Sequence, residues 1–216
     1  QIQDLYANST VRRFACLLRG AGIEDSILKG RRIPKARERG WYPPTPVQSG
    51  FFVMHSQDAT KGGYNMPAAF KASAWLDFGR LEQAAARMIE EDELLRTQFE
   101  MQEGKLIARI SSQADFKLEW MECGRIEEAM EHFVRPFDLK KAPLFRAAMV
   151  KAEGNEPYII IDMHHIISDG ISSQIIFERL HDYYCQKEVH LPELSYVDFA
   201  WWVNENKETA GVECRE

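Results

Sequence analysis

The spacing of apolar residues along the chain predicts several amphipathic helices. Between Arg80 and Glu91, apolar residues recur every three or four positions, so they line one face of a helix. That face consists of Leu81, Ala84, Ala85, Met88 and Ile89. The same spacing predicts helices over residues 5–18, 46–55, 126–134, 171–185 and 196–206.

The helix over residues 46–55 has the clearest start signal. Thr45 supplies a hydroxyl at the cap position, Pro46 follows at the first helical position, and Gln48 stands three residues after the cap. This combination is a capping box. Trp41 and Tyr42 precede it as an extended aromatic entry.

Apolar runs rich in β-branched or alternating residues predict strands between these helices. The runs cover residues 68–76, 94–99, 106–110, 116–121, 144–151 and 158–163. Glu103 and Gly104 separate the second run from the third and indicate a hairpin. Strands interleaved with helices predict an α/β or α+β fold in which a mixed sheet is flanked by helices.

Composition and charge narrow the class of protein. The 216 residues, 45 % of them apolar, suit one good-sized domain with attachments and argue against global disorder. The formal net charge of -6 argues against a nucleic-acid partner. The one basic run, at residues 29–39, is interpreted as a solvated linker.

The cysteines and the apolar runs indicate the cellular compartment. Four dispersed cysteines form no CxxC pair, which indicates neither a zinc site nor a disulfide framework: Cys16, Cys123, Cys185 and Cys214. The chain shows no signal-peptide pattern and no run of ~20 apolar residues. We therefore expect a soluble cytoplasmic protein with reduced thiols and no membrane partner.

Two adjacent histidines end the buried run at residues 158–163. His164 and His165 are followed by Ser168, Asp169 and Gly170, which turn the chain before the next helix. Imidazoles exchange protons near physiological pH, and strand ends beside a helix start often carry the chemistry of α/β enzymes. Because adjacent strand residues point to opposite faces, only one of the two histidines faces a given pocket.

The residues of this turn allow several interpretations. Asp169 either orients an imidazole or pairs with an arginine, because a buried carboxylate needs a cation or several donors. Gly170 leaves room for a substrate to pass close to the backbone. The alternatives are packing histidines, a metal site and a Ser-His-Asp hydrolase. A metal site lacks a fourth ligand, and Ser168 lies in no G-x-S-x-G context.

The segment Met163–Gly170 (MHHIISDG) closely resembles the HHxxxDG motif of condensation domains of nonribosomal peptide synthetases. Three further signatures of these domains occur in the same order along the chain. They are Thr45–Gly50 (TPVQSG), Asp92–Phe99 (DELLRTQF) and Tyr196–Trp201 (YVDFAW), and the segment Pro136–Arg146 is also family-like. The resemblance covers Trp41 to Trp202.

The sequence departs from the family pattern at two signatures. Gly50 stands where the first signature usually carries an arginine, and Glu91-Asp92 stands where the second usually opens Arg-His. An arginine at that opening would be a partner for the motif aspartate. Its absence leaves Arg96 as the candidate for structural support of Asp169.

The resemblance implies the N-terminal lobe of a chloramphenicol acetyltransferase-like fold, with a tunnel between two lobes. It implies attack of an acceptor amine on a donor thioester, which forms an amide. His165 is then the histidine that faces the tunnel and positions the amine or takes its proton, His164 supports it, and Asp169 has a structural role. Ser168 and Gly170 are expected to contact substrate. Neither a metal nor a directly bound cofactor is expected, because substrates arrive on phosphopantetheine arms.

The resemblance also divides the chain. Asp4–Ala15 resembles the last helix of a peptidyl carrier domain, so we expect residues 1–22 to end a carrier, 23–40 to be a linker and 41–216 to be the condensation lobe. The expected partners are upstream and downstream carrier domains, an adenylation domain and the missing C-terminal lobe. Without that lobe, we expect the fragment to be inactive.

Other members of the superfamily remain as alternatives. Heterocyclising relatives replace the first motif histidine with aspartate, and His164 argues against them. Epimerising relatives fit less well because Asp169-Gly170 is intact, and non-catalytic recruiting modules often lose the histidine found here at His165. A CoA-dependent acyltransferase is disfavoured by the signatures at Thr45 and Tyr196.

Overall fold

The computed structural model describes residues 33–37, 40–57, 62–72 and 75–206. The chain divides into two compact units, Gln1–Pro34 and Lys35–Glu216, and the second is described below. The helix predicted over residues 5–18 lies outside the described residues. None of the helices that the structure describes is long and apolar enough to cross a membrane.

A four-stranded sheet forms the centre of the second unit. Its strand order is β2-β7-β6-β5, and these strands span Ala68–Lys71, Glu156–Met163, Phe145–Ala152 and Glu119–Glu122. β5 pairs with β6 in parallel, whereas the other neighbours are antiparallel. The mixed sheet predicted from the sequence is therefore confirmed.

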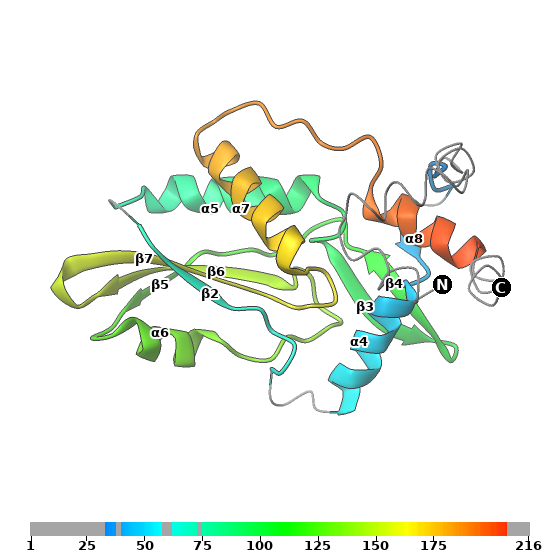
Figure 1. Cartoon of the computed structure of the whole chain (residues 1–216), viewed down its shortest axis with the longest axis horizontal. Helices are drawn as coiled ribbons and strands as arrows, with labels where there is room; N and C mark the ends of the chain where they lie inside the picture. Colours follow the sequence, from blue (N-terminus) through cyan, green and yellow to red (C-terminus); the bar gives the residue numbers. More distant parts are fainter. Residues whose placement is uncertain (1–32, 38–39, 58–61, 73–74, 207–216) are drawn as a thin grey trace, which may run out of the picture. The chain divides into compact units, whose positions relative to one another are not determined.

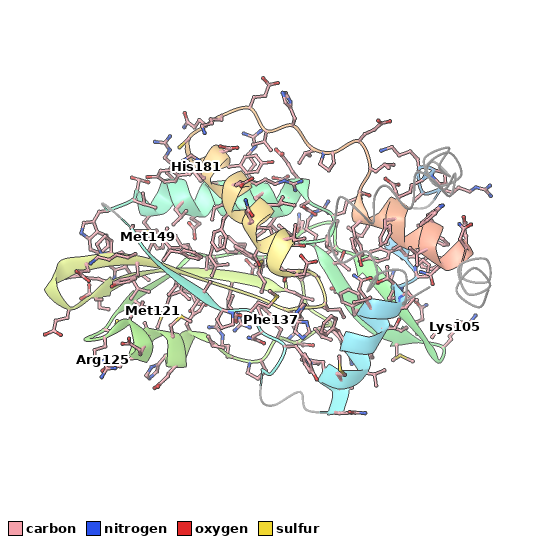
Figure 2. The ribbon with its side chains drawn as sticks, in the orientation of Figure 1. Lys105, Met121, Arg125, Phe137, Met149 and His181 are labelled. Carbon is pink, nitrogen blue, oxygen red and sulfur yellow. The ribbon has the colours of Figure 1, made fainter. Side chains whose placement is uncertain are left out.

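Helices cover both faces of this sheet (Figure 1). Alternate residues of β6 point to opposite sides: Ala147 and Met149 pack in the larger core with α5 (Phe78–Glu91) and α7 (Gly170–Tyr184). Ala148 and Val150 pack in a smaller core with α6, Ile126–Phe133. Figure 2 shows Met149 on the side of α5 and Met121 on the side of α6.

The helix α5 follows the predicted pattern closely. The five apolar residues that share one face in the sequence are the five that the structure buries. Asp77 caps the first turn, where its carboxylate accepts the backbone N–H of Arg80 at 2.7 Å. The apolar period therefore predicted this element and the side it buries.

A second sheet of three strands lies beside α4 (Pro46–Gln57) and α8 (Tyr196–Glu205) (Figure 1). Its order is β1-β4-β3, with bounds Trp41–Tyr42, Lys105–Ile110 and Thr97–Gln102. The predicted hairpin joins β3 to β4, and its two turn residues, Glu103 and Gly104, both have positive φ. Two residues with positive φ match the right-handed twist of the strands.

Three predicted strands begin or end three residues or more from the predicted position. Leu94–Arg96 form a turn, and β3 begins only at Thr97, whose N–H bonds the Leu94 carbonyl at 3.1 Å. β5 begins at Glu119 and not at residue 116, because the N–H of Leu118 donates to Glu82 of α5 instead of a neighbouring strand. β2 ends at Lys71, which pairs with Tyr158, the third residue of β7.

Candidate active site

The two histidines occupy the turn that leaves β7. The N–H of His164 bonds the Leu144 carbonyl at 3.1 Å, and the N–H of His165 bonds the Tyr64 carbonyl at 2.8 Å. These bonds fix the backbone on both sides of the strand end. The His164 side chain is fully buried, whereas His165 is half-buried and lines a cavity. The expectation that only one histidine faces a pocket is confirmed.

His164 is held by its own turn and by α4. Its Nδ1 accepts the N–H of Ile166 at 3.0 Å, and its Nε2 lies 3.2 Å from Nδ1 of His55. The His164 ring meets the His55 ring edge-on, with centroids 5.0 Å apart. Burial, with smaller effects from His55 and His165, lowers the pKa of His164 to about 3. His164 is therefore a neutral residue at physiological pH.

His165 stacks on Phe51 of α4, with ring centroids 4.5 Å apart and planes 20° from parallel. The cavity beside it has a volume of about 140 Å³. Its Nδ1 is buried and forms no hydrogen bond among the described residues. Besides His165, the cavity is lined by Val47, Gln48, Phe51, Leu94, Ile166, Ile167, Ser168, Asp169, Ser172 and Tyr196.

Asp169 caps α7. Its Oδ1 accepts the backbone N–H and the hydroxyl of Ser172, each at 2.7 Å, and these bonds hold the pKa of Asp169 below its usual value. The expected pairing with Arg96 is absent from the described residues. Arg96 donates instead to the Ser111 carbonyl at 2.6 Å. The prediction was wrong because Asp169 is exposed, so helix N–H groups and water satisfy its charge without a cation.

The two predicted substrate contacts lie at the cavity and its edge. Ser168 lines the cavity, and its hydroxyl donates to the His164 carbonyl at 3.1 Å. Gly170 is the first residue of α7, and a Cβ placed there would meet no atom within 4 Å. Packing therefore does not require glycine at this position, and the space beside it is open.

One face of α4 packs against the histidine turn. Gln48 donates from Nε2 to the Ile166 carbonyl at 3.2 Å, Phe51 stacks on His165, and His55 reaches His164. These residues are three and four positions apart, so they lie on one side of the helix. The roles of Gln48 and His55 were missed in the sequence, although their spacing with Phe51 was a signal that could have indicated them.

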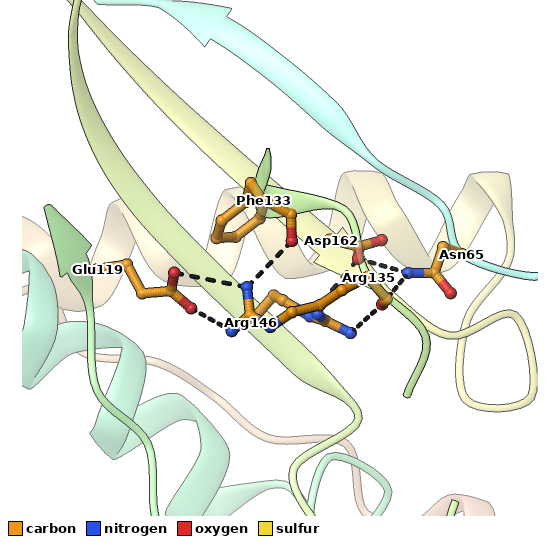
Figure 3. A network of polar contacts seen from close by, with 6 residues as sticks. All are labelled: Asn65, Glu119, Phe133, Arg135, Arg146 and Asp162. Atoms are coloured by element: carbon orange, nitrogen blue, oxygen red, sulfur yellow. Dashed lines mark hydrogen bonds and ion pairs between the residues drawn. The ribbon is translucent and has the colours of Figure 1, made fainter. Parts of the chain in front are cut away.

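A charged network supports the strand that carries the turn (Figure 3). Asp162 lies on β7 directly opposite Arg146 on β6, and its Oδ2 is 3.5 Å from Arg146 Nε. The same oxygen accepts from Nδ2 of Asn65 at 2.7 Å, and Asn65 forms a β-bridge with His164. Burial raises the pKa of Asp162 to about 6, although Arg146 and Asn65 act in the opposite direction.

Arg146 completes this network. Its Nη2 donates to the Arg135 carbonyl at 2.6 Å, and its guanidinium lies 3.6 Å from the centre of the Phe137 ring. Arg135 in turn pairs with Glu119 on β5. Sequence reasoning missed the network, because Arg146 and Asp162 come together only through the register of two strands.

A wider groove adjoins the histidine cavity. Its volume is about 450 Å³, and it shares four lining residues with that cavity: Leu94, Ile167, Ser172 and Tyr196. The turn before β3, the helix α7 and the segment before α8 form its walls. An ion pair between Arg179 and Asp92, at 2.8 Å, joins two of these walls. Among the described residues, no three His, Cys, Asp or Glu are placed to hold a metal.

Comparison with known proteins gives a consistent family. The family model described as Condensation domain matches residues 38–215. Bacitracin synthase 2 of Bacillus licheniformis is 37 % identical over 190 residues, which are 86 % of this chain and 7 % of that protein. Gramicidin S synthase 2 of Aneurinibacillus migulanus is 37 % identical over 214 residues, 98 % of this chain and 5 % of that protein.

Solved structures agree at the level of the fold. The starter condensation domain of rhizomide synthetase matches with a TM-score of 0.68 at 18 % identity, over 79 % of this chain and 44 % of that one. The X-domain from teicoplanin biosynthesis matches with a TM-score of 0.73 at 19 % identity, over 83 % and 41 %. The fold expected from the resemblance is confirmed, and the chain belongs to the condensation domain family.

Proposed function

We propose that this chain carries the histidine wall of an amide-forming site in a nonribosomal peptide synthetase. The observation that supports it most directly is the position of His165, which lines a cavity while His164 is buried and hydrogen-bonded. In the proposed reaction an acceptor amine attacks a donor thioester, the tetrahedral intermediate collapses, and the donor's thiol leaves. Both substrates are delivered on the phosphopantetheine arms of carrier domains.

The surroundings of His165 support a role in positioning. In hydrolytic triads a carboxylate accepts from the second ring nitrogen of the histidine that takes up a proton. Here Nδ1 of His165 has no such partner among the described residues, and Asp169 is engaged with Ser172. We therefore propose that His165 hydrogen-bonds the reacting amine through Nε2, and that Asp169 acts by fixing the start of α7.

We propose that a second lobe, outside these 216 residues, supplies the other wall of the site. The matched condensation structure is more than twice as long as its matched region, since the match covers 44 % of it. We propose that a C-terminal lobe closes the groove and that the 216-residue chain alone is inactive. The partners are an upstream carrier that ends within residues 1–22, a downstream carrier and an adenylation domain.

The segment that precedes β1 supports the proposed linker over residues 23–40. The N–H of Ala36 donates to Oδ1 of Asp198, at 2.7 Å, and Asp198 is a fully buried residue of α8. Lys35 lies 3.7 Å from the other oxygen of the same carboxylate. A linker that enters through this contact has a defined attachment point on the lobe.

The test compares His165→Ala with His181→Ala in the complete synthetase with loaded carriers. His181 is an exposed histidine of α7, labelled in Figure 2, and is a matched control. Mass spectrometry of the downstream carrier measures amide formation. We expect His165→Ala to lose about 10²-fold or more in rate and His181→Ala to retain it. Full activity of His165→Ala would refute the proposal, and donor epimerisation without amide formation would assign the chain to the epimerising relatives instead.

A further inference from the structure

The contact between His55 and His164 has no counterpart in the sequence signatures described above. His55 lies one turn beyond Phe51 on the face of α4 that packs against the histidine turn. Its Nδ1 is 3.2 Å from Nε2 of His164, a hydrogen-bonding distance between two imidazoles. One of the two nitrogens must carry the proton, and the surrounding bonds decide which.

The proton positions follow from the backbone of the turn. The N–H of Ile166 donates to Nδ1 of His164 at 3.0 Å, so Nδ1 carries a lone pair. A neutral imidazole has one N–H, so the proton of His164 is on Nε2. Nε2 therefore donates to His55, and Nδ1 of His55 is an acceptor. Burial, which keeps His164 neutral, agrees with this assignment.

We propose that His55 is a positioning residue, which fixes the tautomer of His164 and thereby the turn that presents His165. The acceptor at His55 makes the Nε2–H tautomer the favoured one. Only that tautomer leaves Nδ1 free to hold the N–H of Ile166. Gln48 of α4 binds the carbonyl of the same Ile166, so α4 holds one polar group of this residue directly and His164, which contacts His55, holds the other.

Removal of the acceptor leaves the turn with two unfavourable choices. If His164 keeps its proton on Nε2, a buried N–H lacks a partner. If the proton moves to Nδ1, it meets the N–H of Ile166 and that bond breaks. Either outcome loosens the segment that leads to His165. His55 is itself only half-buried, so its replacement removes little packing.

The test uses two variants of the full 216-residue chain and one control. His55→Asn keeps an acceptor, because the side-chain oxygen of asparagine can occupy the position of Nδ1. His55→Leu removes the acceptor. His132→Leu makes the same chemical change on the exposed face of α6. Nitrogen-15 NMR of the imidazoles reports which ring nitrogen of His164 carries the proton, and hydrogen exchange reports the Ile166 amide.

We expect wild type, His55→Asn and His132→Leu to show His164 with its proton on Nε2. We expect His55→Leu to show mixed tautomers and about tenfold faster exchange at Ile166. A proton on Nδ1 of His164 in wild type overturns the proposal, even if His55→Leu does not fold. An unchanged tautomer and unchanged exchange in a folded His55→Leu overturn it as well.

The consequence for turnover rests on the proposed function. In the complete synthetase, His55→Leu is expected to lower kcat for amide formation with little change in KM, and His55→Asn to restore most of it. The tautomer measurement does not depend on activity. If His165→Ala were fully active, the proposed function would fail while the NMR result on His55 stood; if the tautomer were unaffected, only the role of His55 would fail.

Discussion

Replacement of Gln48 by leucine tests how strongly α4 is held to the histidine turn. The Gln48 side chain is 1 % exposed and makes three hydrogen bonds. Oε1 accepts the N–H of Thr45 at 3.1 Å, and Nε2 donates to the Tyr42 hydroxyl at 3.3 Å and to the Ile166 carbonyl at 3.2 Å. Leucine has a similar volume and no polar atom, so it removes all three bonds without leaving a large cavity.

The expected loss follows from the groups that are left behind. Each of the three partners loses a hydrogen bond in a buried or half-buried setting, and such a loss costs about 1 kcal/mol or more. We therefore expect Gln48→Leu to lower the free energy of unfolding by about 3 kcal/mol. Thr45→Ala removes the cap from the same box and should cost about 1 kcal/mol.

Urea unfolding of the 216-residue chain, followed by circular dichroism, measures both losses. Ser56→Ala is the control, because Ser56 is an exposed residue of α4 whose hydroxyl donates to the Phe52 carbonyl in the same helix. We expect that change to stay within about 0.5 kcal/mol of wild type. The reasoning fails if Gln48→Leu lowers the free energy of unfolding by no more than Thr45→Ala does, with an unchanged m-value. In that case the bonds to Tyr42 and Ile166 contribute nothing to stability.

Two further predictions concern pH and the hairpin. Burial raises the pKa of Asp162 from 3.8 to about 6, so the folded chain gains a proton before the unfolded chain as pH falls. Between pH 7 and 4, wild type should therefore gain about 2 kcal/mol relative to Asp162→Asn, and a difference independent of pH would contradict this. Glu103 has a φ of 51° in the hairpin. Glu103→Asn should raise the free energy of unfolding by about 0.5 kcal/mol, whereas an unchanged urea midpoint would show no strain there.

The pH dependence of the whole chain contains an opposing contribution. Burial lowers the pKa of His164 from 6.5 to about 3, so the unfolded state binds the proton first as pH falls below 6.5. This stability is present above pH 6.5 and is lost toward pH 3. The wild-type curve therefore combines a gain from Asp162 with a loss from His164. Only comparison with Asp162→Asn isolates the first.

Local patterns predicted what depends on neighbours in sequence. The buried face of α5 followed from its period, and the opposite directions of His164 and His165 followed from strand alternation. The cap at Asp169 could also have been predicted from the sequence, because Ser172 lies three residues later, where a helix-capping side chain accepts the backbone N–H. The expectation of an arginine partner assumed a buried carboxylate, whereas Asp169 is exposed.

Contacts between distant segments were not predictable from these patterns. Arg146 and Asp162 each interrupt an apolar run, and nothing within either run indicates the other as its partner. They pair because β6 and β7 align them directly opposite one another. The start of β3 also differs from the prediction. The sequence predicts that Leu95 lies in a strand, but this residue is buried while it lies in a turn. An apolar pattern indicates that a residue is buried. It does not determine whether that residue lies in a strand, a helix or a turn.

Direct contacts join three signatures that lie far apart in the sequence. The Thr45 hydroxyl lies 3.1 Å from the Tyr196 hydroxyl, which joins the first signature to the fourth. Gln48 joins the first signature to the third through Ile166. Each bond is modest by itself, and Thr45 and Gln48 also bond each other, so one connected set of hydrogen bonds links the three signatures. A substitution at Thr45 or Tyr196 should therefore alter the position of His165, although neither residue carries out the proposed chemistry.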